Sequence, residues 1–192
     1  MLKIVQAPDE VLSAKAKEVK AVDKAIKNLL RDMEEALDAA SDPEGVGLAA
    51  PQVGKSLQIF IVRQTPKSPL LTFINPKIKK FIDDEKSAKI QQIENVKRAR
   101  KKKRAVQLEG CLSLKDIWGV VERHPSLELT YQDENGKKFT KIFDGFLATI
   151  IQHETDHLNG VLFPKRVLEQ KNKLYHSSKN SEGETEFEEL SI

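Results

Sequence analysis

Residues 152–157, with the sequence QHETDH, constrain the fold of this chain more than any other segment. On an α-helix the side chains at positions i and i+4 share a face, so His153 and His157 point the same way and can bind one metal ion. Glu154 lies beside them, where its carboxylate can handle the proton of a water molecule activated by that ion. The segment therefore predicts a helix that carries a metal site, and it favours metal-assisted hydrolysis as the chemistry.

The sequence around this segment predicts the bounds of the helix and several other elements. The apolar run 146–151 and the pair Asn159-Gly160 place the helix from about residue 145 to residue 158. A second, amphipathic helix is predicted over 24–40, with Asp23 as its N-cap. Strands are predicted at 57–62, 70–74, 120–121, 127–131 and 137–143, with Asn135-Gly136 as a hairpin turn.

Length and composition indicate an ordinary globular protein. The chain has 192 residues, 39% of them hydrophobic and 32% charged, which suits one domain with a sizeable core. No apolar run approaches the roughly 20 residues needed to span a bilayer, and the first forty residues have the features of neither a signal nor a transit peptide. Cys111 is the single cysteine, so no intrachain disulfide can form. We therefore expect a cytoplasmic protein without a membrane partner.

Charge and polarity divide the chain into regions. A catalytic domain is expected over 1–165, interrupted by a basic insert at about 81–105. The insert holds nine basic and four acidic residues, a net charge of +5, so the rest of the chain carries −2. Apolar residues become sparse after Pro164, and five glutamates lie within 182–189. Residues 166–192 are therefore expected to form a polar, flexible C-terminal tail.

A hydrolytic metal site generally needs a third protein ligand, and the sequence offers few candidates. One branch of HExxH proteases has a histidine six residues after the second motif histidine, but Phe163 occupies that position here. His176 lies further downstream. A second protease branch uses a downstream glutamate, for which Glu169 is the best candidate, but a weak one because the downstream glutamates lie mostly in the polar tail. Cys111, in the segment EGCLS at 109–113, is the better one. A lone cysteine is more often a small buried apolar residue, but a thiolate binds iron or zinc strongly.

Three motifs stand in order along the chain: GVGLAAPQ at 45–52, EGCLS at 109–113 and QHETDH at 152–157. Together they resemble the three signature motifs of the peptide deformylase family, and the similarity covers most of residues 1–165. The resemblance implies an α+β fold in which antiparallel or mixed β-sheets pack around a central helix that carries the HExxH motif. It also implies removal of the N-formyl group from the formyl-methionine of newly made polypeptides, with release of formate.

The resemblance further implies a role for individual residues. Cys111, His153 and His157 would bind a ferrous ion, with zinc or nickel as substitutes. Glu154 would carry the proton, while the Gln52 side chain and the Leu112 amide would hold the formyl oxygen as it gains negative charge. Positions that bind the substrate backbone or support the site match Gly45, Gly47 and Glu109. Two roles remain open for Asp156: it is either a solvated residue of the helix or the partner of Arg123 in an ion pair behind the site.

The basic insert departs from the expected pattern of the family. Such a run of charge can be a solvated surface loop, or an arm that binds RNA and holds the enzyme at the ribosome, where its substrate emerges. The residues that would contact RNA are Lys97, Arg98, Arg100, Lys101, Lys102, Lys103 and Arg104.

Two other functions fit parts of the sequence. An endoprotease would share the HExxH segment, but Phe163 in place of the third histidine argues against it. A non-enzymatic RNA-binding or ribosome-binding relative would explain the insert, but it would not need Cys111, Glu154 and Gln52. A metal-dependent deformylase uses all of these residues.

Overall fold

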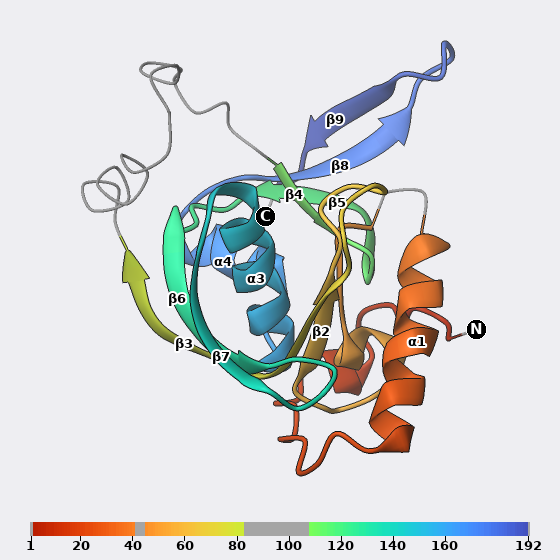
Figure 1. The fold of residues 1–192 in the computed structure, drawn as a ribbon. Helices are drawn as coiled ribbons and strands as arrows, with labels where there is room; N and C mark the ends of the chain where they lie inside the picture. The colour runs from red at the N-terminus through yellow and green to blue at the C-terminus, as the bar shows by residue number, and fades with distance from the viewer. Residues whose placement is uncertain (1, 41–44, 83–107, 192) are drawn as a thin grey trace.

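Two antiparallel sheets enclose the helix that carries the HExxH segment (Figure 1). The computed structural model describes residues 2–40, 45–82 and 108–191. The first sheet has the order β1-β2-β3-β6-β7 and the second the order β4-β5-β8-β9. The strands are β1 Gly47–Ala49, β2 Ile59–Val62, β3 Leu71–Ile82, β4 Leu108–Cys111, β5 Leu114–Val120, β6 Ser126–Gln132, β7 Lys138–Asp144, β8 Leu174–Lys179 and β9 Thr185–Glu189. The helices are η1 Glu10–Leu12, α1 Lys24–Asp38, η2 Ala50–Val53, α3 Gly145–Leu158 and α4 Phe163–Glu169.

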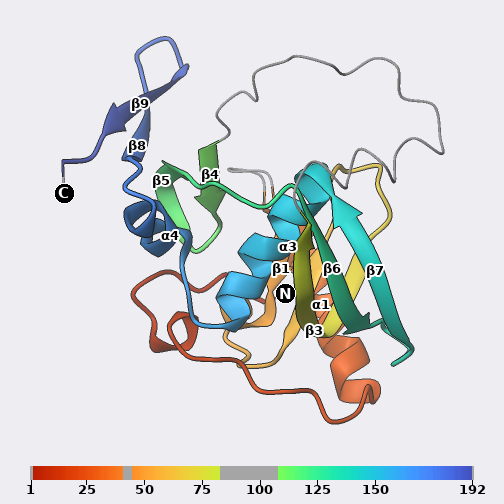
Figure 2. The same cartoon turned by 90° about the vertical axis from the view of Figure 1, so that its left-hand side faces the viewer.

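The helix α3 packs its apolar side chains against the first sheet. Ile151 is fully buried and belongs to one core cluster with Phe60 of β2, Phe73 of β3 and Leu129 of β6. Burying a side chain of this size stabilises the fold by roughly 1.5–3 kcal/mol. The predicted bounds of this helix are confirmed, and the helix lies between the two sheets (Figure 2), with His157 beside Cys111 of β4.

The strand β2 connects the two halves of the core. Its four residues are all buried, and because side chains alternate along a strand, Phe60 faces the α3 cluster while Ile59 and Ile61 face α1. Asp23 caps α1 as predicted, accepting a hydrogen bond from the backbone N–H of Ile26. The amphipathic helix α1 thus covers the outer side of the first sheet. Strand β1 of that sheet carries Gly47 and leads into η2.

The strand β3 is longer than the sequence predicts. The strand predicted at 70–74 corresponds to the first part of β3, which continues through Asn75-Pro76 to Ile82. Asn75 adopts φ of 50° and the register with β6 shifts between Ile74 and Lys77, so the pair forms a bulge within the strand. The Asn75 side chain stabilises the bulge because it bonds both the N–H and the carbonyl of Val19.

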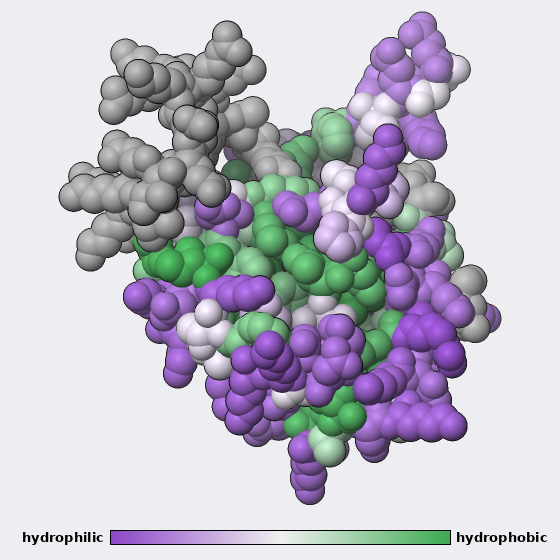
Figure 3. Space-filling model, in the orientation of Figure 1, coloured by the Kyte–Doolittle hydropathy of each residue, from purple (hydrophilic) through white to green (hydrophobic). Residues whose placement is uncertain are grey.

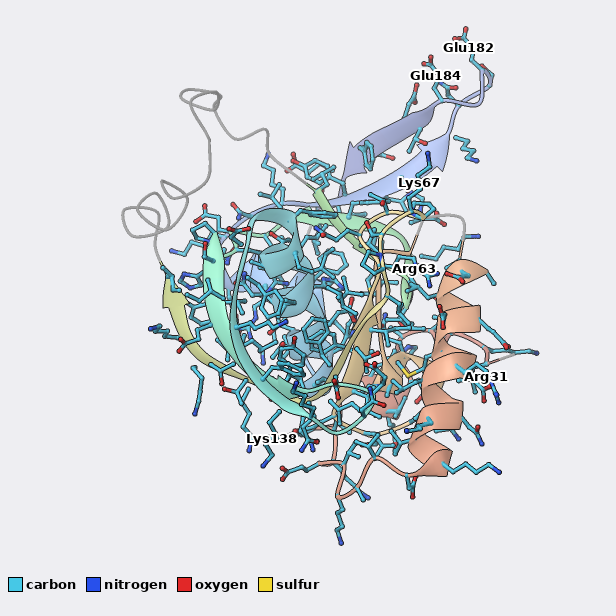
Figure 4. All side chains as sticks on the ribbon, viewed as in Figure 1. Arg31, Arg63, Lys67, Lys138, Glu182 and Glu184 are labelled. Atoms are coloured by element: carbon cyan, nitrogen blue, oxygen red, sulfur yellow. The ribbon has the colours of Figure 1, made fainter. Side chains whose placement is uncertain are left out.

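The segment predicted to be a polar, flexible tail has regular secondary structure over its described residues. After α4, β8 pairs with β5 and β9 pairs with β8, so the C-terminal segment extends the second sheet as a hairpin. The hairpin projects from the body, with Glu182 and Glu184 at its tip (Figures 1 and 4). The glutamates of β9 are exposed, which explains why composition alone suggested an unfolded segment.

Most of the basic insert lies outside the described residues. Residues 83–107, which include the seven candidate RNA contacts between 97 and 104, lie outside the described residues. None of the helices in the described ranges is long and apolar enough to cross a bilayer.

Candidate active site

The candidate site forms where α3 meets the end of β4 and the helical turn η2. The helix α3 carries His153 and His157 one turn apart on one face. Antiparallel pairing of β4 with β5 brings Cys111 beside them, at a shift in register that follows Gly110. The turn η2, which begins at Ala50-Pro51, buries Gln52 against the same cysteine. Residues separated by about a hundred positions are thus brought together by sheet pairing rather than by local sequence.

The side chains of Cys111, His153 and His157 form a group that can hold a metal ion. One ligand atom from each lies within 4.8 Å of the others, and the Cys111 sulfur is 3.2 Å from Nε2 of His157. Burial lowers the pKa of His157 well below its ordinary value, so this ring stays neutral, which is the form that binds a metal. One sulfur and two imidazole nitrogens suit iron, zinc or nickel.

The surroundings of His153 favour positive charge at the centre of this group. Its Nδ1 lies 3.1 Å from Oε2 of Glu109, which leaves Nε2 for a ligand bond. Burial lowers the pKa of His153, but its hydrogen bonds with Cys111 and Glu109 outweigh burial and raise the pKa well above its ordinary value. The ionised Glu109 that helps His153 retain a proton would also favour a metal cation there, so the residues fit the metal that the sequence suggests.

A buried arginine organises the groups behind the histidines. Arg123 makes a two-pronged ion pair with Glu109 at 2.8 and 2.9 Å, and its Nη1 lies 2.7 Å from Asp156. Burial raises the pKa of Glu109, but the bonds from Arg123 and His153 prevail and lower it to about 2. Glu109 therefore stays ionised and orients His153. Of the two roles open for Asp156, the ion pair with Arg123 is the one found, and Arg166 also binds Asp156 at 2.7 Å.

Glu154 lies in a pocket that Gly47 keeps open. A Cβ atom placed on Gly47 would stand 2.3 Å from Oε1 of Glu154, so a side chain at this position would displace the carboxylate. The other oxygen, Oε2, is buried and has no hydrogen-bond partner among the described residues. Burial raises the pKa of Glu154 to about 7, although the charge of His153 opposes this. A carboxyl group with such a pKa can both accept and return a proton near neutral pH.

The orientation of the Gln52 amide is fixed by its neighbours. Its Oε1 accepts a hydrogen bond of 2.8 Å from the backbone N–H of Ala49. The amide group Nε2 therefore points the other way, toward the Cys111 sulfur at 3.5 Å and the hydroxyl of Ser113 at 3.4 Å. Gln52 is 1% exposed, so it is a fixed donor beside the metal group rather than a polar residue of a surface loop.

These groups open into one pocket of about 230 Å³. Every predicted catalytic and substrate-binding residue lines it, as do Cys111 and His153, while His157 lies beneath them, 1% exposed. Other lining residues that the sequence did not assign are Val46, Leu108, Gly110, Trp118, Phe146, Thr149 and Ile150. On the face shown in Figure 3, apolar side chains gather at the centre between the sheets, whereas hydrophilic residues cover α1. The pocket pairs a polar floor with apolar walls, as is typical of sites for small ligands.

The alternative third ligands are placed elsewhere. Glu169 binds Arg166 at 2.9 Å on α4, and His176 lies on β8 in an exposed position. Phe163 is buried, with its ring 6.2 Å from that of His153, so this position supports the histidine by packing. The Glu109–Arg123 pair was missed at the sequence level, because the two partners are fourteen residues apart on different segments and neither has a local pattern that points to the other.

Comparisons with known proteins agree with this geometry. A family model described as polypeptide deformylase matches residues 1–173. The peptide deformylase of Borreliella burgdorferi is 38% identical over 162 residues, which cover 84% of this chain and 85% of that protein. Peptide deformylase 1 of Bacillus cereus is 38% identical over 167 residues, which cover 87% and 92% of the two chains.

Solved structures give the same result for the fold. A peptide deformylase from Synechococcus elongatus, solved in complex with actinonin, superposes with a TM-score of 0.70 at 36% identity and covers 86% of this chain and 78% of that one. The Thermotoga maritima peptide deformylase superposes with a TM-score of 0.68 at 32% identity. The superposition covers 86% of this chain and 97% of that structure. The chain therefore belongs to the peptide deformylase family, the metal-dependent hydrolases that remove the N-formyl group from newly made polypeptides.

Proposed function

We propose that this deformylase holds its metal through Cys111, His153 and His157 and that Glu154 carries the proton in the reaction. The observation that carries the proposal is the meeting of one sulfur and two imidazoles within 4.8 Å, with the buried Glu154 beside them. We assign a ferrous ion to the site, with zinc or nickel as substitutes, because thiolate and imidazole bind all three. A bound divalent metal would lower the pKa of water and polarise the formyl oxygen.

Other groups of the site transfer the proton, stabilise the oxyanion and orient His153. Glu154 accepts the proton of the attacking water and passes it to the nitrogen of the leaving amine, for which a pKa of about 7 is suited. Gln52 Nε2 donates a hydrogen bond to the formyl oxygen as negative charge develops on it, and the backbone N–H of Leu112 is the second donor. Glu109, held by Arg123, keeps the proton of His153 on Nδ1.

The close packing around Glu154 explains selection of the formyl group. Gly45 and Gly47 line the pocket, and a Cβ atom on Gly47 would stand 2.3 Å from Oε1 of Glu154 and 2.9 Å from Cγ2 of Ile150. A formyl carbon carries only hydrogen, so it fits where a larger acyl group would be excluded by shape. We propose that the chain following the formyl group lies along Gly45, Gly47 and Glu109.

We also propose that the enzyme acts in the cytoplasm and contacts the ribosome. A free thiol ligand requires reducing conditions, which favours the cytoplasm. The +5 charge of residues 81–105 on a body of −2 favours contact with ribosomal RNA through the basic residues between 97 and 104.

Release of formate from formyl-Met-Ala-Ser by anaerobically purified protein tests the function. We expect turnover by the wild type, and we expect the Glu154→Ala variant to keep its metal but lose deformylation. A casein digest in parallel separates this activity from an endoprotease. Turnover by the Glu154→Ala variant at the wild-type rate would remove Glu154 as the proton carrier.

A further inference from the structure

Trp118 of β5 connects the pocket with the C-terminal hairpin. Its indole lines the pocket and lies against Gly110, where an added Cβ atom would stand 2.8 Å from the indole carbon Cζ3. Gly110 precedes Cys111, so the indole packs on the backbone next to a proposed metal ligand. The other side of the indole contacts the hairpin. Its Nε1 donates a hydrogen bond of 3.0 Å to Ser177 Oγ, and its ring meets that of Phe187 edge-on, with the ring centroids 5.9 Å apart.

The strand register puts these three side chains on one face of the second sheet. Trp118 pairs with Tyr175 across β5 and β8, so the side chain of Ser177, two residues further along β8, faces the same way. Ser177 pairs in turn with Phe187 across β8 and β9. The pocket wall thus continues from β5 onto the hairpin without a break.

Ser177 and Phe187 restrict the indole in different ways. Ser177 is 9% exposed, and its hydroxyl accepts a hydrogen bond from the indole and donates one of 3.5 Å to the carbonyl of Asp116, which uses its donor and one of its two acceptor lone pairs. Phe187 is 46% exposed on an otherwise polar strand, and its ring contact is with Trp118. Ser177 fixes the direction of the indole N–H, and Phe187 packs perpendicular to the indole ring.

We propose that Ser177 and Phe187 are positioning residues that hold Trp118 as a wall of the peptide pocket, so that the β8–β9 hairpin sets the affinity for the peptide. The inference rests on the proposed function of the site. Both residues lie beyond residue 173, where the match to the family model ends. Peptide affinity in this enzyme therefore depends on a segment outside the matched domain.

The test uses the fact that Trp118 is the single tryptophan of the chain. Its fluorescence and its quenching by acrylamide report directly on the indole. We compare the metal-loaded wild type with Phe187→Ala and Ser177→Ala, and with the conservative variants Phe187→Tyr and Ser177→Thr. Glu188→Ala is the matched control, because Glu188 pairs with His176 and lies on the opposite face of the same hairpin. Binding of the product peptide Met-Ala-Ser and the kinetics with formyl-Met-Ala-Ser are measured for each.

Loss of either partner should expose the indole, shift its emission to longer wavelength and increase quenching. The KM for the formyl peptide and the Kd of the product should each rise about fivefold, with kcat and metal content unchanged. The conservative variants should restore wild-type values, and Glu188→Ala should not differ from the wild type. Unchanged quenching, or changed quenching with unchanged peptide affinity, would overturn the proposal. If the wild type released no formate, the proposed function would be wrong, while quenching and product binding would still decide the role of the hairpin.

Discussion

The amide nitrogen Nε2 of Gln52 lies 3.5 Å from the sulfur of Cys111, although 59 residues separate them in the sequence. The contact places a neutral hydrogen-bond donor beside a proposed metal ligand. Because Ala49 binds the opposite end of the same amide, the donor cannot turn away. An amide fixed in this way can stabilise negative charge on a substrate oxygen without competing for the metal, as a carboxylate would.

Replacing this donor should slow the reaction while leaving the metal in place. For Gln52→Leu we expect kcat to fall by roughly 10²–10³, the usual effect of losing one oxyanion donor. Steady-state formate release and metal analysis of the same sample check this. Gln58→Leu is the control, since Gln58 bonds the carbonyl of Ala16 away from the pocket. A Gln52→Leu enzyme with wild-type kcat would show that the amide does not contact the reacting oxygen.

Gly47 should be required because of the space that it leaves for Glu154. In Gly47→Ala the new methyl group would meet Oε1 of Glu154, so the carboxylate must move. A displacement of about 1 Å can cost on the order of 100-fold in rate, and we expect a loss of that size in kcat. Thermal unfolding of the same variant separates this effect from misfolding. A stable Gly47→Ala protein with full activity would argue that the position of Glu154 is not critical.

Loss of Arg123 should destabilise the fold itself. Arg123→Met would leave the carboxylates of Glu109 and Asp156 buried without their shared partner, which generally costs about 3–5 kcal/mol. Urea unfolding in the presence of a chelator measures this cost apart from metal binding. The control is Lys80→Met, whose exposed pair with Glu128 should contribute less than about 1 kcal/mol. Equal stabilities for the two variants would contradict the structural role of Arg123.

The basic insert should matter at the ribosome but not in the active site. Deleting residues 86–104 removes the dense positive charge, so co-sedimentation with ribosomes at low salt should fall while turnover of a short formyl peptide stays the same. Wild-type co-sedimentation should itself weaken as salt rises. If the deletion variant sediments with ribosomes like the wild type, the insert does not bind RNA there.

Local sequence was sufficient for some elements and not for others. The helix α3 could be predicted because its apolar run, histidine spacing and terminal Asn159-Gly160 are all local signals. The full length of β3 could not, because Asn75-Pro76 is also a common strand end. The structure uses the left-handed tendency of Asn75 to form a bulge instead. The strand β9 was missed because all its side chains are exposed, so no alternation marks it.

The residues of the site likewise fall into those that local sequence predicts and those that it does not. His153, His157 and Glu154 follow from one motif, whereas Cys111 was inferred as the third ligand from its thiolate chemistry and from Phe163 at the expected histidine position, and the resemblance to a family supported that inference. The pairing of β4 with β5 that brings it there is set by packing between distant segments. The bond from Trp118 to Ser177 had no sequence signal at all, since it joins two strands that pair only in the folded chain.

The metal content of anaerobically purified wild type and Cys111→Ala protein tests the central claim most directly. We expect one metal ion per wild-type chain together with formate release that a chelator abolishes. For Cys111→Ala we expect metal affinity to fall by more than about 100-fold, because even residues that only support a ligand can cost that much, and deformylation to be lost. A Cys111→Ala protein that binds the metal as tightly as the wild type and still releases formate would contradict the account.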